Sequence, residues 1–201
     1  LFYQLRGGLK HFHYYLCRRL GGGMEIIMDN HYNHFKKIDA HSHIGKFGSP
    51  FNIDFDLQRL MEQMETYNIE KTILCPAGCH LNEELKDAYQ AAPDKIIPLC
   101  WVNANEGQEA YDMLEHYLRD ENFAGVKMQP LFDAFTADSP MVDPIMEIAE
   151  AYQKPVFIHC GHPPFSLPWQ IGLLAERHPH VPTVMIHMGH GHGVYIEGSL
   201  N

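Results

Sequence analysis

The segment IDAHSHIG, at residues 38–45, carries two histidines, His41 and His43, directly after a short apolar stretch. Side chains two positions apart on a β-strand point to the same face. We therefore expect both imidazoles to project in one direction from the end of a strand. Two imidazoles held on a rigid element can bind one metal ion, and imidazole suits zinc, iron, nickel and copper. The segment predicts part of a metal site.

From residue 37 onward, strand-like and helix-like patterns alternate along the chain. Six short apolar runs, bounded by Gly, Pro, Asn and Asp, are predicted as strands: 37–41, 71–75, 96–102, 124–128, 155–160 and 183–187. Apolar residues at helical spacing lie between them, as in Leu57, Leu60, Met61 and Met64. The repeat predicts an α/β protein of parallel strands with covering helices. It fits either an open doubly wound sheet or a (β/α)₈ barrel truncated after about six units.

Two further histidines lie at the ends of predicted strands. His159 is at the end of the fifth strand and His187 at the end of the sixth. Because parallel strands direct their carboxyl ends to one face, both histidines are expected to converge with His41 and His43. We interpret His41, His43 and His159 as metal ligands. The alternative is that they are hydrogen-bonded loop residues, since 15 histidines make chance His-x-His pairs common.

The amino-acid composition argues against several classes of protein. The 201 residues are 45% hydrophobic and 20% charged, with a net charge of −10. The acidic balance argues against nucleic-acid binding, which relies on Lys and Arg at phosphates. No apolar run reaches the roughly 18 residues of a membrane span. Five cysteines, an odd number, are typical of reduced thiols in the cytoplasm rather than of a disulfide framework.

Four motifs together resemble the amidohydrolase superfamily, and within it amidohydrolase family 2. They are IDAHSHIG (38–45), GVKMQP (125–130), PVFIHCGHPP (155–164) and TVMIHMGH (183–190). The resemblance implies a (β/α)₈ TIM-type barrel that holds one or two divalent metals, and it favours the truncated barrel over the open sheet. It also implies that His41, His43 and His159 are metal ligands.

The same resemblance implies roles for four further residues. His187 is implied as a catalytic residue that binds a second metal, or that orients and protonates the substrate. Lys127 is implied as a carboxylated lysine bridging two metals or as a cation facing an acidic substrate, while a solvated lysine is the third alternative. His162 and His190 are expected to contact substrate. The family's essential aspartate, at the end of an eighth strand, has no counterpart in this sequence.

The first expected activity is metal-dependent hydrolysis of a small-molecule substrate. Zinc is the metal expected first, with manganese or another divalent ion as the alternative, and its bound water would attack an amide, ester or lactone carbonyl. The alternative activity is non-oxidative decarboxylation of an aromatic or unsaturated acid, which the same histidines would serve. Another alternative is an inactive, truncated metal-binding fragment. A metal-dependent deoxyribonuclease is disfavoured because it would carry glutamate where Lys127 stands.

Residues 1–23 differ in charge from the rest of the chain. They contain four basic residues, Arg6, Lys10, Arg18 and Arg19, and no acidic one. We interpret them as a basic leader outside the fold, and residues 24–201 as an incomplete metal-dependent hydrolase barrel. An incomplete barrel exposes sheet edges, so pairing with another chain, as in a homo-oligomer, is expected. Neither a membrane nor a nucleic acid is expected as a partner.

The segment CPAGCH, at residues 75–80, has the spacing of half a zinc site. No second cysteine pair accompanies it, and Cys75 is expected at the buried end of a strand. We therefore interpret Cys79 and His80 as residues at the rim of the histidine site. Trp101 is interpreted as a core residue.

Overall fold

The computed structural model describes residues 16–20, 23–27, 34–48, 52–190 and 199. The chain divides into two units, Leu1–Lys36 and Lys37–Asn201. In the first unit, β1 (Leu16–Leu20) and β2 (Gly23–Ile27) pair in antiparallel register. The interpretation of residues 1–23 as a leader outside the fold stays a prediction.

The second unit is built on a seven-stranded sheet in the order β4-β3-β5-β6-β7-β8-β9. Its strands are β3 (Lys37–Phe47), β4 (Ile53–Phe55), β5 (Ile69–Pro76), β6 (Ile96–Trp101), β7 (Gly125–Met128), β8 (Val156–His159) and β9 (Thr183–Ile186). From β3 to β9 the neighbours are parallel, and only β4 pairs antiparallel, with β3. A doubly wound sheet reverses its strand order partway, whereas these strands advance in one direction, as in a (β/α)₈ barrel. The predicted truncated barrel is confirmed.

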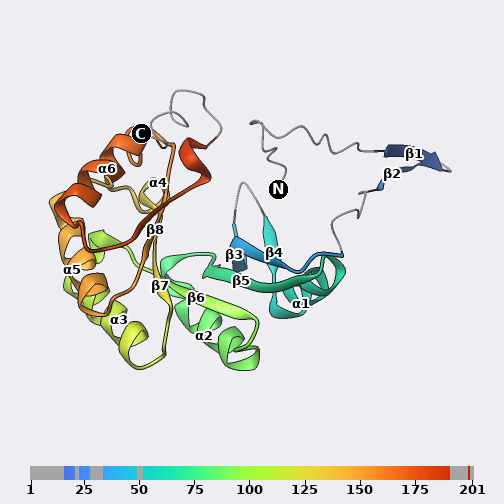
Figure 1. Ribbon diagram of the computed structural model, residues 1–201, viewed down its shortest axis with the longest axis horizontal. Coiled ribbons are helices and arrows are strands. Elements are labelled where there is room, and N and C mark those ends of the chain that lie inside the picture. Colours follow the sequence, from blue (N-terminus) through green and yellow to red (C-terminus); the bar gives the residue numbers. More distant parts are fainter. Residues whose placement is uncertain (1–15, 21–22, 28–33, 49–51, 191–198, 200–201) are drawn as a thin grey trace. The chain divides into compact units, whose positions relative to one another are not determined.

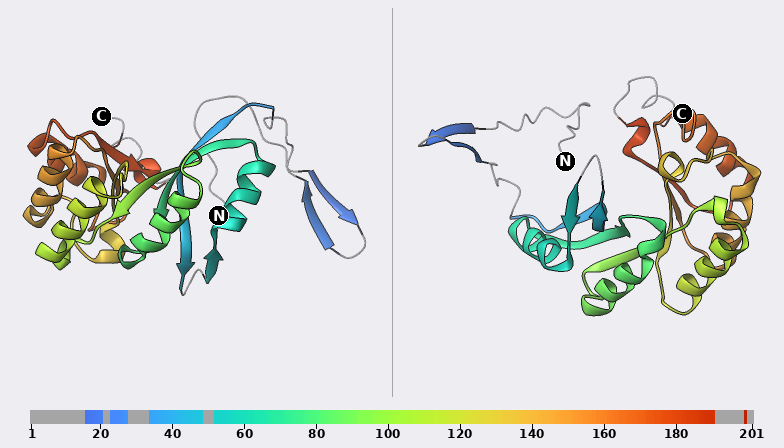
Figure 2. Two further views of the ribbon diagram at one scale, coloured as in Figure 1. Left: turned by 90° about the horizontal axis from the view of Figure 1, so that it is seen from below. Right: turned by 180° about the vertical axis from the view of Figure 1, so that it is seen from behind.

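Helices connect the parallel strands and cover one face of the curled sheet, where α3, α5 and α6 lie side by side (Figures 1 and 2). The longer helices are α1 (Leu57–Thr66), α2 (Asn82–Ala91), α3 (Gln108–Arg119), α5 (Asp143–Ala151) and α6 (Pro168–Arg177). Short helical turns α4 (Pro130–Asp133), η1 (Cys79–Leu81), η2 (Ala104–Glu106), η3 (Pro140–Val142) and η4 (His187–Gly189) lie in the connections. In the part of the chain that the structure describes, no helix is both long and apolar enough to span a bilayer.

The core lies between the sheet and these helices. Every residue of β7 is buried, as expected of a strand covered on both faces. Val126 and Met128 on this strand, with Ile158 on β8 and Leu114 and Ile145 on α3 and α5, have no exposed surface. At α1, the Asp56 carboxylate accepts a hydrogen bond from the Arg59 backbone N–H, which fixes the start of the helix so that Leu60 and Met64 face inward.

Four local features differ from the sequence-based expectation. Strand β3 continues to Phe47 instead of ending at residue 41, because Gly45–Phe47 pairs with β4. A register shift between Asp39 and Ser42 interrupts its pairing with β5. Helix α2 had no prediction, and β9 ends at Ile186, so His187 begins η4 instead of closing the strand.

The buried side chain of Asn82 joins the connection after β5 to the end of β6. Its Nδ2 donates to the carbonyl oxygens of Cys79 and Trp101 at 2.9 and 2.8 Å, and its Oδ1 accepts from the Trp101 N–H at 2.9 Å. We expect Asn82→Ala to lower the free energy of unfolding by about 2–4 kcal/mol, since several buried polar groups lose a partner. Urea unfolding measures this change. Gln58→Ala, which removes an exposed hydrogen bond to Glu62, is the control and should change stability by less than about 0.5 kcal/mol.

Candidate metal centre

His41 and His43 face each other in the middle of β3. Their ring centroids are 4.7 Å apart and their Nε2 atoms 3.1 Å apart. His43 Nδ1 donates to the Pro76 carbonyl oxygen at 2.9 Å, which leaves the Nε2 lone pair of His43 available. Two imidazoles bound to one zinc ion at about 2.1 Å have nitrogens about 3.0–3.4 Å apart. The observed separation of the two Nε2 atoms fits a shared divalent ion.

A second group of histidines follows β8 and β9. The ligand atoms of His159, His162 and His190 all lie within 4.8 Å of one another, and His159 Nε2 is 2.8 Å from His162 Nδ1. Among the described residues, this grouping does not extend to His41 and His43. The interpretation of His41, His43 and His159 as one ligand set therefore stays a prediction.

His187 lies between the two groups. Its ring centroid is 5.5 Å from that of His41, 4.9 Å from that of His159 and 5.4 Å from that of His190. Six histidines thus form a continuous cluster. It contains all six histidines predicted for the site: His41, His43, His159, His162, His187 and His190.

Close backbone packing brings the end of β8 against η4. Gly161 has a φ of +108°, and a Cβ at this position would lie 2.5 Å from the Gly189 carbonyl carbon. Only glycine fits such an approach. In the segment that carries two of the histidines, His187, Met188 and His190 all have positive φ values, which are strained for residues with side chains. Such strain persists only where surrounding structure imposes it.

Burial keeps the histidine rings neutral. It lowers the pKa of His41 and of His159 to about 2, and that of His43 and of His187 to about 4. The positive charge of Lys127 lowers all four pKa values further. Neutral imidazole is the form that binds a metal ion, so the cluster is in a ligating state at neutral pH.

Lys127, on β7, places a buried ammonium group beside these rings. The residue has no exposed surface, and among the residues that the structure describes its Nζ has no hydrogen-bond partner. Nζ lies 5.7 Å from the centroid of the Trp101 ring. Burial lowers the pKa of Lys127 to about 8, while Cys75 and Asp133 act in the opposite direction. A buried cation without a partner is costly, which makes this amine a candidate for binding an anion.

Asp133 belongs to the site although sequence reasoning did not identify it. Its Oδ2 accepts a hydrogen bond from Trp101 Nε1 at 2.8 Å, and burial raises its pKa to about 6. Trp101 is 1% exposed, in keeping with its interpretation as a core residue, but its ring also lies 6.0 Å from that of His43. Asp133 follows β7 in a connection without periodicity, so no sequence pattern marks it.

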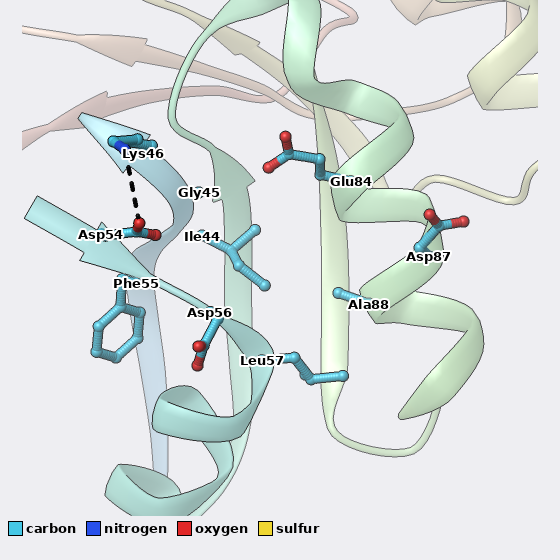
Figure 3. A pocket seen from close by; sticks show the side chains of 10 residues that line it. All are labelled: Ile44, Gly45, Lys46, Asp54, Phe55, Asp56, Leu57, Glu84, Asp87 and Ala88. Carbon is cyan, nitrogen blue, oxygen red and sulfur yellow. Dashed lines mark ion pairs between the residues drawn. The ribbon is translucent and has the colours of Figure 1, made fainter. Parts of the chain in front are cut away.

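A separate pocket of about 520 Å³ lies between the β3–β4 hairpin and helices α1 and α2 (Figure 3). Four carboxylates line it, those of Asp54, Asp56, Glu84 and Asp87, and Lys46 pairs with Asp54 at 3.9 Å. The lining includes none of the clustered histidines. The pocket is therefore distinct from the candidate metal centre.

The fold and this cluster define a (β/α)₈-barrel protein with imidazoles gathered at the carboxyl ends of its strands. A family model described as amidohydrolase matches residues 38–198. The chain belongs to this family, amidohydrolase family 2. Membership supports a divalent metal in the protein. Among curated proteins, none matches the chain.

Solved structures share the fold. A 5-carboxyvanillate decarboxylase from Novosphingobium aromaticivorans, with bound manganese, has a TM-score of 0.64 and 15% identity over 78% of this chain and 67% of its own. A 2,6-dihydroxybenzoate decarboxylase from Rhizobium has a TM-score of 0.60 and 16% identity over the same shares. A protein called amidohydrolase II has a TM-score of 0.61 and 17% identity over 77% and 67%. The chain spans about two-thirds of the length of these structures.

Proposed function

We propose that this chain binds a divalent metal and removes the carboxylate of a small acid without oxidation. The observation that carries the proposal is Lys127: a fully buried ammonium group that has no hydrogen-bond partner in the described part of the chain and lies beside four neutral imidazoles. A site built for a neutral amide or ester has no need of such a cation. An anionic substrate would supply the missing partner and offset the cost of burying the charge.

The metal would be held by His41, His43 and His159. When bound, a divalent ion supplies a Lewis acid that binds oxygen atoms of the substrate. Lys127 Nζ binds an anionic oxygen of the acid through a charge-assisted hydrogen bond and so fixes its orientation.

Decarboxylation breaks the bond between the carboxylate carbon and the rest of the acid, and leaves the electron pair on the remaining carbon. One proton must then reach that carbon as carbon dioxide leaves. We assign proton delivery to His187, since its ring lies between the two histidine groups. An anionic substrate beside this imidazole raises its pKa and favours the protonated form.

Two similar structures support the choice of reaction and of metal. Both are named as decarboxylases of aromatic acids, and the first contains manganese. Their identity to this chain is 15–16%, which shows a common fold alone. Because the first of these structures contains manganese, we choose manganese as the first ion to test, ahead of the zinc expected from the sequence.

Hydrolysis of a C–N or C–O bond is the second candidate. The match of residues 38–198 to a family described as amidohydrolase favours it. Neutral, buried imidazoles serve this reaction as well, because they leave a bound ion available to polarise a carbonyl group. Hydrolysis gives no specific role to the charge of Lys127.

The reaction is tested with the chain loaded with Mn²⁺ or with Zn²⁺. A panel of hydroxybenzoic acids labelled with ¹³C in the carboxylate is incubated beside the matching amides and methyl esters. We expect labelled carbon dioxide from at least one acid and no cleavage of the amides or esters. Cleavage of an amide or ester without release of carbon dioxide would establish hydrolysis instead. Full metal occupancy without either product would mean that this chain is an inactive metal-binding fragment, and would overturn the proposal.

A further inference from the structure

A second group of potential ligands lies outside the histidine cluster. The ligand atoms of Cys79, His80 and Glu106 all lie within 4.8 Å of one another. Cys79 and His80 belong to η1, after β5, and Glu106 ends η2, after β6. The group therefore joins two neighbouring connections at the carboxyl ends of the sheet. It uses Cys79 and His80 without Cys75, and so differs from the CxxxC half-site that the sequence analysis set aside.

The separations within this group are those of metal ligands rather than of good hydrogen bonds. Glu106 Oε1 is 3.4 Å from His80 Nε2 and 3.8 Å from Cys79 Sγ. A nitrogen–oxygen hydrogen bond is usually about 2.7–3.2 Å long. Around a tetrahedral zinc ion with ordinary bond lengths, a carboxylate oxygen lies about 3.3 Å from an imidazole nitrogen and about 3.5 Å from a thiolate sulfur. Small adjustments would bring all three atoms around one ion.

Neighbouring side chains hold Cys79 in place and lie close to Glu106. Asn103 Nδ2 is 3.4 Å from Glu106 Oε1, while Asn103 Oδ1 accepts from the Asn105 N–H at 3.1 Å. The Cys79 carbonyl oxygen accepts from buried Asn82, which is itself bonded to Trp101. Cys79 is buried at 8% exposure, whereas His80 is exposed and free to complete the site. Such supporting contacts are typical of sites that orient their ligands in advance.

The charges around the group favour a cation. Asp133 and Glu106 both raise the pKa of Cys79, in addition to the effect of burial, and Glu106 also raises that of Asp133. The positive groups facing these acids are His80 and Lys127, which lower the pKa of Asp133. Two carboxylates and a thiol thus lie close together with little compensating charge. A divalent ion would neutralise them and favour the thiolate.

We propose that Cys79, His80 and Glu106 form a binding site for a zinc-type divalent cation, separate from the histidine cluster. A thiolate, an imidazole and a carboxylate together select zinc or cobalt over manganese or magnesium. Three protein ligands leave the fourth position to water. The ion ties the connections after β5 and β6 together next to Asp133. This inference does not depend on the proposed reaction.

Cobalt titration of the metal-free chain tests the site. A thiolate bound to Co²⁺ gives an intense sulfur-to-cobalt charge-transfer absorption in the near ultraviolet, which imidazole and carboxylate ligands do not give. We expect this band to report one of the cobalt ions bound per chain, while the histidine cluster binds cobalt without it, and we expect the band to be absent from Cys79→Ser. Cys75→Ser is the matched control, because it removes the thiol beside His41, and it should keep the band.

A second variant keeps the test decisive if Cys79→Ser does not fold. His80→Gln alters an exposed side chain and should weaken cobalt binding, followed by the same band, by about tenfold or more. His116→Gln, which removes another exposed histidine beside carboxylates, should leave it unchanged. Absence of the band from the unaltered chain, or its persistence at full strength in Cys79→Ser, would overturn the proposal and leave His80 and Glu106 as an ion pair only.

Discussion

Replacing His41 and His43 together with alanine is expected to weaken Mn²⁺ binding at the histidine cluster by at least about 100-fold, since loss of a residue that merely supports a ligand already weakens binding 10–100-fold. The two Nε2 atoms, 3.1 Å apart, are the pair in this cluster best placed to share an ion. Removing both leaves His159, His162 and His190 without the two imidazoles of β3 as further ligands. Manganese is the suitable probe because it prefers nitrogen and oxygen ligands to the thiolate of the Cys79 group.

Electron paramagnetic resonance of free Mn²⁺ during titration measures this affinity. The matched control is the double replacement His11→Ala and His13→Ala, which removes another His-x-His pair of the same chain. It should bind Mn²⁺ as the unaltered chain does. If the His41 and His43 double variant also bound one equivalent at unchanged affinity, the assignment of these residues as ligands would be wrong.

Lys127→Met is expected to lower kcat/KM for a carboxylic acid substrate by at least about 30-fold, because loss of one partner of a buried charge pair costs about 2–5 kcal/mol. Methionine occupies a similar volume without the charge, so packing around Trp101 is kept. Mn²⁺ binding should not weaken, since the proposal gives Lys127 contact with the substrate and not with the metal, and removing its positive charge favours a nearby cation. Loss of Mn²⁺ together with activity would instead indicate a carboxylated lysine that ligates the metal.

The same substitution is expected to stabilise the fold. Burial lowers the pKa of Lys127 from 10.5 to about 8, so the folded chain releases this proton at a lower pH than the unfolded chain does. This difference lowers the free energy of unfolding by about 3 kcal/mol below pH 8, and the effect disappears as the pH rises through 10.5. The advantage of Lys127→Met in urea unfolding should therefore shrink across this range. Lys95→Met removes an exposed charge and should show no such trend; an equal trend in both variants would contradict a buried cation.

Much of the fold could be predicted because strand and helix periodicity are local properties of the chain. Five of the six predicted strands match β5 to β9 within two residues at each end, and the first matches the start of β3. The turn of β3 into a hairpin with β4 was not predicted, because it depends on pairing of Gly45–Phe47 with Ile53–Phe55 across a connection. Helix α2 escaped prediction since its buried residues, Asn82, Leu85 and Ala88, include a polar one.

The candidate site, like the fold, could be predicted from the sequence only in part. Spacing within one strand was enough to place His41 and His43 on one face, and the parallel order of strands was enough to bring His159 and His187 to the same end of the sheet. The close approach of Gly161 to Gly189, which joins His159 to His190, depends on the backbone of two separate segments. Asp133 and Glu106 lie in connections whose paths no periodic pattern describes.

The amino-acid sequence by itself determined that histidines from three strand segments come to one side of the sheet and that the strands progress as in a barrel, because hydrophobic periodicity and side-chain alternation act between near neighbours in the chain. Only the tertiary structure decided that Lys127 is buried without a hydrogen-bond partner among the described residues, that His187 lies between two histidine groups, and that Cys79 meets Glu106. These outcomes depend on the curvature of the sheet and on the packing of distant connections, where the free energy of a group is set by neighbours far away in sequence.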